Sequence, residues 1–180
     1  MAATNQATDP GGGGVTLTAS GTVTVNSTAL QLVKQVWNTA GVCLASSPAD
    51  ATCNSSATTI TVPANTQLKF IIFVKNTSAL ALSDVRFQDV LDVSGTGFTY
   101  VAGSLKYDAS QADTATSAQI YTAVDAGTAE TDAIDTAAGH YASVTGGSNI
   151  TVGAVVGQVN AALSVANNKT FALKFQAIKK

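Results

Sequence analysis

Few residues of this chain have side chains that could perform chemistry, and the clearest are two cysteines. Cys43 and Cys53 flank the nine-residue segment LASSPADAT, which is polar and contains a proline. An even pair of cysteines closing a short loop is typical of a structural disulfide in an oxidising compartment. Two unrelated buried thiols are the alternative, which the exposed character of the loop disfavours. The pair therefore predicts a disulfide and a secreted, cell-surface location.

The residues needed for catalysis are sparse. The single histidine, His140, lies in the stretch AAGHYAS, where a lone histidine is more often a surface or packing residue. No Gly-x-Ser-x-Gly nucleophile elbow is present, and neither glycine-rich stretch is followed by the Gly-Lys-Ser/Thr of a phosphate loop. One histidine and two paired cysteines also make a zinc site improbable. We therefore predict a protein that is not an enzyme and has no catalytic residues or bound cofactor.

A group of acidic residues makes calcium the one metal to consider. Carboxylates with loop carbonyls are the ligands that Ca²⁺ prefers, but the spacing fits no EF-hand loop, so a solvated acidic loop is the simpler interpretation. Three other acids, Asp84, Asp89 and Asp92, are predicted to face water at strand ends and to discourage edge pairing. The weak calcium candidates are Asp125, Glu130, Asp132 and Asp135.

Glycosylation is the other modification that the sequence suggests. Five of the ten asparagines stand in Asn-x-Ser/Thr sequons, whereas chance would give about two with so many Ser and Thr residues. Turn chemistry, which also favours Asn beside Thr or Ser, is the alternative explanation. The candidate acceptors for glycans are Asn26, Asn54, Asn76, Asn149 and Asn168.

Composition indicates that the elements positioning these residues are strands. Charged residues make up only 11% of the 180, with one Glu and one Arg, while Thr and Ser together number 40. Helical surfaces need more Glu, Lys and Arg than this, and Thr and Val favour strands. The net charge of −2 excludes the basic face that nucleic-acid binding requires, so no nucleic acid is expected as a partner. No apolar run approaches the roughly 18 residues of a membrane span.

Short alternating runs separated by turn residues predict an antiparallel β-sandwich. Helix is limited to a turn or two near residues 111–127, because that region has no sustained apolar stripe. The run FIIFVK (residues 70–75) is apolar on both faces, so it is predicted to lie in a sheet interior or beneath an added element. Val85, Phe87 and Leu91 are predicted to point inward. The expected strands are residues 15–19, 23–25, 30–37, 58–62, 68–75, 82–91, 98–101, 104–107, 119–124, 141–144, 149–152 and 170–178.

Residues 62–108 resemble a bacterial and archaeal surface-repeat family catalogued as domain of unknown function eleven. The matching positions are Pro63–Thr66, Val74–Ser78, Asp89–Leu91 and Phe98–Ser104, and Lys34 stands where the family's opening strand has its lysine. Asp92 replaces the proline that the family prefers, and residues 109–148 form an insertion rich in Ala, Thr and Asp. The resemblance covers most of residues 30–178. It implies an immunoglobulin-like sandwich with a scaffolding role in a cell-surface or adhesive protein.

Residues 1–29 are surplus to that domain, which would occupy residues 30–180. They hold the glycine-rich stretch DPGGGG, predicted to be a flexible linker, and then a strand candidate. Such a strand either folds back on its own sheet or completes the sheet of a neighbouring subunit, and head-to-tail donation of this kind builds a filament. The donor candidates are Val15, Leu17, Ala19, Val23 and Val25, and the acceptor-groove candidates are Phe70, Ile72 and Val74.

These features lead to a functional hypothesis. The chain is predicted to be a structural subunit of an extracellular filament, pilus or sheath, with copies of itself as its partners. A monomeric adhesive or ligand-binding module of a cell-surface protein is the alternative. The first ten residues have neither the basic start nor the apolar middle of a signal peptide, so we expect an exported chain to be in its mature form.

Overall fold

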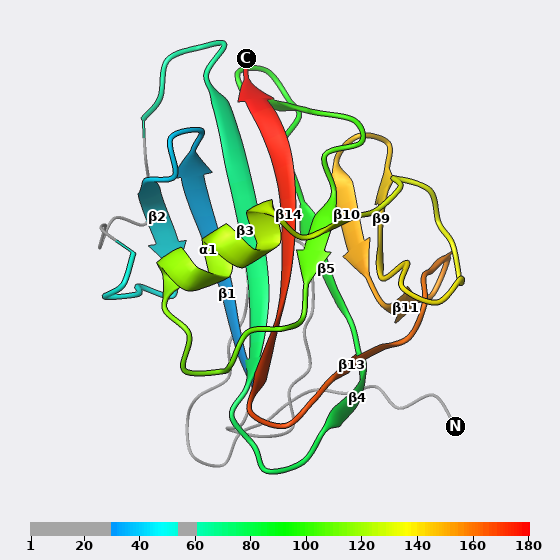
Figure 1. Cartoon of the computed structure of the whole chain (residues 1–180). Coiled ribbons are helices and arrows are strands. Elements are labelled where there is room, and N and C mark those ends of the chain that lie inside the picture. Colours follow the sequence, from blue (N-terminus) through cyan, green and yellow to red (C-terminus); the bar gives the residue numbers. More distant parts are fainter. Residues whose placement is uncertain (1–29, 54–60) are drawn as a thin grey trace, which may run out of the picture.

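The fold is a sandwich of antiparallel sheets with one short helix outside it, as seen in a computed structural model (Figure 1). The structure describes residues 30–53 and 61–180. Within these ranges the prediction of an all-β sandwich is confirmed. The three candidate strands within residues 15–25 and 58–62 lie wholly or mostly outside the described residues.

The larger sheet has seven strands in the order β2-β1-β3-β14-β7-β8, and β6 pairs with the end of β14. Its two longest strands, β3 and β14, lie at the centre and are paired over ten residue positions, from Asn76 beside Lys169 to Gln67 beside Ile178. The strands are β1 (Leu30–Asn38), β2 (Cys43–Ser47), β3 (Gln67–Asn76), β6 (Phe98–Tyr100), β7 (Lys106–Asp108), β8 (Thr128–Ala129) and β14 (Lys169–Lys179).

The second layer is smaller and is built from three small sheets. A three-stranded sheet has the order β5-β10-β9, β4 pairs with β13, and β11 and β12 form a hairpin. Its strands are β4 (Leu82–Val85), β5 (Phe87–Val90), β9 (Ala142–Thr145), β10 (Asn149–Val152), β11 (Ala154–Val155), β12 (Gln158–Val159) and β13 (Leu163–Val165).

Gly153, which follows β10, allows the backbone of this layer to close up. Its φ is +76°, a conformation that L side chains rarely adopt. A Cβ at this position would lie only 2.4 Å from the carbonyl oxygen of Val85. Only glycine therefore fits this approach between the end of β10 and the end of β4.

The main core lies between the two layers. Phe70, Ile72 and Val74 of β3 contribute to it from the larger sheet, and Phe87 and Ile150 contribute from the smaller one. Each of these five side chains is at most 5% exposed. At roughly 1.5–3 kcal/mol for each fully buried large apolar side chain, this cluster is the principal source of stability.

The opposite face of the larger sheet is covered by helix α1 (Ser117–Asp125), which runs across the strands (Figure 1). Ile71 and Phe73 of β3 pack there against Ile120 and Val124, one helical turn apart. This confirms that both faces of residues 70–75 are covered, since β3 lies inside its sheet and beneath an added helix.

The prediction of a strand over residues 119–124 is wrong, and so is the limit of two helical turns. The nine residues of α1 make about two and a half turns. Thr116 caps the helix by accepting a hydrogen bond from the N–H of Gln119, whose side chain in turn accepts one from the Thr116 N–H. The apolar stripe of the helix is short, but it falls on the face that meets the sheet.

Two further boundaries differ from the sequence-based expectation. β2 lies within the segment expected to be an exposed loop between the cysteines. The expected strand over residues 82–91 is divided at Arg86 into β4 and β5. The inward positions of Val85, Phe87 and Leu91 are confirmed, because each is at most 7% exposed.

Candidate functional site

The smaller layer does not extend across the whole larger sheet, and this leaves a candidate site for an additional strand. Contacts between the layers place Tyr141, next to β9, 5.1 Å from Tyr107 of β7, measured between ring centroids. In the same way, Phe87 of β5 lies 6.5 Å from Phe171 of β14. Within the described residues β5 pairs only with β10, and β1 and β2 lie to the left of β5, β10 and β9 in the view of Figure 1.

β5 is therefore an edge strand. It pairs with β10 over four positions, and the described residues provide no strand on its other side. Unpaired N–H and C=O groups along such an edge are a template for another strand. Leu30, Val36 and Leu44 of β1 and β2 are only partly buried and pack against the main core, whereas Leu32 on the same face of β1 is buried. We use the name β5 groove for this region, which consists of the edge of β5 and the partly buried apolar side chains of β1 and β2.

An ion pair crosses the gap between the layers at this groove. The Nζ atom of Lys34, on β1, lies 2.6 Å and 2.7 Å from the two carboxylate oxygens of Asp89, on β5. The Asp89 side chain is 5% exposed and that of Lys34 is 27% exposed. Lys34 also lies over the ring of Phe70, 5.6 Å from its centroid. The prediction that Asp89 faces water is wrong, because its side chain points inward to meet a lysine 55 residues away in the sequence.

The predicted groove residues Phe70, Ile72 and Val74 are buried in the main core. Their strand, β3, is paired with β1 on one side and with β14 on the other along its length, so it offers no free edge. The Phe70 ring stacks on Phe175 at a centroid distance of 5.1 Å. Of these residues, Phe70 lies beneath the Lys34 ammonium, and among the described residues the edge that remains unpaired in this region belongs to β5. The predicted donor residues Val15, Leu17, Ala19, Val23 and Val25 lie outside the described residues.

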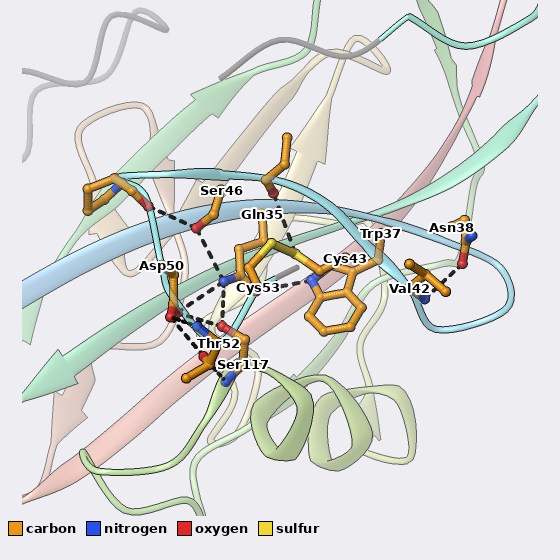
Figure 2. The surroundings of a disulfide bond; sticks show 12 residues. Gln35, Trp37, Asn38, Val42, Cys43, Ser46, Asp50, Thr52, Cys53 and Ser117 are labelled. Atoms are coloured by element: carbon orange, nitrogen blue, oxygen red, sulfur yellow. Dashed lines mark hydrogen bonds between the residues drawn. A yellow bond between two sulfur atoms is a disulfide. The ribbon is translucent and has the colours of Figure 1, made fainter. Parts of the chain in front are cut away.

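The predicted disulfide between Cys43 and Cys53 is confirmed, and it fastens the β2 loop beside helix α1 (Figure 2). A polar cluster buried next to it joins strand, loop and helix. The Gln35 amide donates to Ser117 Oγ at 2.6 Å, and its oxygen accepts from the indole N–H of Trp37 at 3.0 Å. Ser117 Oγ donates to Asp50 at 2.6 Å. These contacts hold the start of the helix against the sheet and the disulfide-closed loop.

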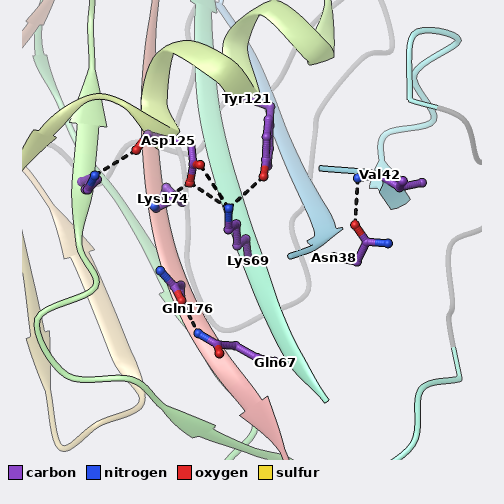
Figure 3. A network of polar contacts seen from close by, with 9 residues as sticks. Asn38, Val42, Gln67, Lys69, Tyr121, Asp125, Lys174 and Gln176 are labelled. Carbon is purple, nitrogen blue, oxygen red and sulfur yellow. Dashed lines mark hydrogen bonds and ion pairs between the residues drawn. The ribbon is translucent and has the colours of Figure 1, made fainter. Parts of the chain in front are cut away.

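The other end of the helix is held by lysines (Figure 3). Nζ of Lys69 and Nζ of Lys174 lie 3.0 Å and 2.8 Å from Oδ1 of Asp125, and Lys69 also donates to the Tyr121 hydroxyl. Burial alone would raise the pKa of Asp125, but the hydrogen bonds from the two lysines outweigh it and lower that pKa. Burial lowers the pKa of Lys174, whose side chain is 3% exposed. Lys106 donates to the Asp125 carbonyl at the helix C-terminus.

The four calcium candidates do not come together. Asp125 binds lysines; Glu130 accepts hydrogen bonds from two backbone N–H groups, of Tyr141 and Ala142. Asp132 accepts from the Tyr100 hydroxyl and the Gly103 N–H, and Asp135 accepts from the Ala137 N–H. Among the described residues, no three His, Cys, Asp or Glu side chains are grouped so as to hold a metal. Although these four carboxylates are close in the sequence, each one therefore has different hydrogen-bond partners.

His140 lies in the loop that leads to β9. The imidazole Nδ1 is 4.0 Å from the Asp135 carboxylate. The backbone N–H of His140 donates to the Ala137 carbonyl, and the backbone carbonyl of His140 accepts from the Ala161 N–H. These contacts connect the loop to the chain before β13.

No helix in the described ranges is long and apolar enough to cross a membrane.

The predicted glycan acceptors have different accessibilities. Asn76 is fully buried, and its amide donates to the carbonyls of Leu80, Val165 and Ala166. The prediction that Asn76 carries a glycan is therefore wrong. Asn168 is exposed in a turn, and Asn149 is partly buried at the start of β10. Asn26 and Asn54 lie outside the described residues.

The fold and the groove are the basis for any functional conclusion, because comparison with known proteins adds nothing. No family of proteins, no curated protein and no solved structure matches the chain.

Proposed function

We propose that this chain is the structural subunit of an extracellular filament, pilus or sheath, in which the N-terminal strand of one subunit completes the smaller sheet of the next. The observation that carries this proposal is the edge of β5, which has no second strand partner among the described residues and lies near partly buried apolar side chains of β1 and β2. A strand added at such an edge gains main-chain hydrogen bonds from the edge and side-chain packing from the floor.

The chain itself contains a segment suited to this groove. Residues 15–25, VTLTASGTVTV, alternate over eleven positions: every odd position is apolar or glycine, and every even position is Thr or Ser. This is the pattern of a strand with one face on a core and one face in water. The segment precedes β1 by four residues.

The geometry of donation dictates the form of the assembly. A donor at the N-terminus and an acceptor on a different surface make a heterologous contact, which repeats without closing unless the rotation completes a ring. The Cys43–Cys53 disulfide supports an extracellular setting, since such bonds persist in oxidising compartments. If the same segment instead paired with its own β5, the chain would be a monomer, consistent with an adhesive or ligand-binding module.

The proposal is tested by negative-stain electron microscopy of the full chain beside Leu17→Asp and Thr18→Asp variants. Leu17 lies on the apolar face of the segment and Thr18 on the polar face, so the two substitutions place the same charge on opposite faces. We expect filaments from the full chain and from Thr18→Asp, and soluble, folded monomers from Leu17→Asp. Monodisperse particles from the unmodified chain would refute the proposal.

A further inference from the structure

We infer that the Lys34–Asp89 ion pair sets the register of the donated strand, and that the small residues Ala19 to Gly21 of the neighbouring subunit lie directly across from Asp89. This inference rests on the proposed function, because it assigns the contact made inside the β5 groove. It names both the acceptor and the segment that fills it.

The position of the pair follows from the topology. On β5, Phe87 and Asp89 point inward, whereas Val90 is 38% exposed and points outward. Lys34 reaches Asp89 from β1, in the larger sheet, and therefore crosses the space that a strand added beyond β5 would adjoin. Directly opposite residues on neighbouring strands have Cβ atoms only about 4.5–5.5 Å apart. An inward side chain across from Asp89 would thus contact the lysine.

Lys34 reaches Asp89 at that position with four methylene groups and an ammonium that donates to both Asp89 oxygens. A strand added there would therefore lie against the Lys34 side chain. A large inward side chain could enter only by displacing Lys34. The Asp89 carboxylate would then be buried without its partner, which is strongly unfavourable.

The donor segment has a matching profile. Its inward positions are large at both ends and small in the middle, where Ala19 and Gly21 stand between Leu17 and Val23. A shift of one residue would turn the polar face inward. A shift of two beyond Ala19 on one side, or beyond Gly21 on the other, would bring Leu17 or Val23 against the ion pair. Only alignments with the small centre at Asp89 keep the pair intact. The argument holds for a parallel or an antiparallel strand, because it depends on the centre of the segment.

The first test compares Ala19→Leu with Thr18→Leu. The two variants introduce a leucine at adjacent positions, of which only position 19 belongs to the alternating apolar set of the segment. We expect Ala19→Leu to raise the critical concentration for filament assembly at least tenfold and Thr18→Leu to change it less than twofold. Adding Lys34→Ala and Asp89→Ala to Ala19→Leu removes the obstructing pair and should restore assembly. Equal effects of the two leucines, or no restoration, would overturn the inference.

The second test locates the contact. A photo-crosslinking amino acid at Val90, which is 38% exposed, is activated in filaments grown from a mixture of ¹⁴N- and ¹⁵N-labelled chains. We expect mixed-isotope crosslinked peptides that contain residues 18–22. Crosslinks to another part of a neighbouring chain would overturn this inference while leaving strand donation intact. Failure of the unmodified chain to form filaments would overturn the proposed function itself, so the two failures are distinguishable.

Discussion

Substituting Lys34 or Asp89 alone should lower the free energy of unfolding by different amounts. The Asp89 side chain is 5% exposed, so Lys34→Met leaves a carboxylate with almost no access to water. Removing one partner of a buried pair costs about 3–5 kcal/mol. The Lys34 side chain is 27% exposed, so after Asp89→Leu its ammonium can turn to solvent, and we expect a loss of only about 1.5–2 kcal/mol.

The double variant tests whether the effects of the two single substitutions are coupled. With Lys34→Met and Asp89→Leu combined, the groove is lined by two apolar side chains and no charge is left buried. Replacement of a whole pair by apolar residues is often close to neutral, so we expect the double variant to unfold within about 1 kcal/mol of the original protein. The two single effects would then be coupled by more than about 2 kcal/mol.

Urea unfolding followed by fluorescence measures these differences. Trp37 is the only tryptophan and is 3% exposed beneath the helix, so its emission reports loss of the fold. The reasoning is refuted if Lys34→Met costs less than Asp89→Leu, or if the two single losses simply add in the double variant.

Three further perturbations have defined outcomes. Reduction of the disulfide, or Cys43→Ser, should lower the free energy of unfolding by about 2.5–3 kcal/mol, as expected for a loop of this length, and thermal melts with and without reductant measure it. Gly153→Ala should destabilise by more than Gly147→Ala, because both glycines have positive φ but only Gly153 has backbone within clash distance of a new Cβ; equal urea midpoints would contradict this. The pKa of Asp125 lies below its ordinary value of 3.8, so its contribution to stability is complete above about pH 4 and is lost as the pH falls through the lower folded-state pKa. The urea midpoint of Asp125→Asn should therefore fall less between pH 5 and pH 2.5 than that of the unmodified protein.

Local patterns were sufficient to predict most strands but not the contacts between layers. Residues 70–75 were recognisable as a doubly covered strand because both alternating sets are apolar. The length of the helix was underestimated, and a strand was expected over residues 119–124, because only Ile120 and Val124 form the apolar face of the helix and a pair at this spacing is too short to stand out in a β-rich sequence.

The polar contacts of the site could not be predicted from the sequence for a different reason. Lys34 and Asp89 are each ordinary in sequence, and only the stacking of two sheets brings them together across 55 residues. Conversely, the acidic residues near 125–135 are close in sequence, yet each turn directs its carboxylate to a different partner. Sequence proximity and spatial proximity therefore diverge most at these polar contacts.

The most direct test of strand donation is a cryo-electron microscopy reconstruction of the assembled protein at a resolution that distinguishes side chains. The account predicts a strand of residues 15–25 from one subunit beside β5 of the next, with its Ala19–Gly21 centre at the Lys34–Asp89 pair. A strand traced back to the same subunit, or a groove left empty between subunits in contact elsewhere, would contradict it.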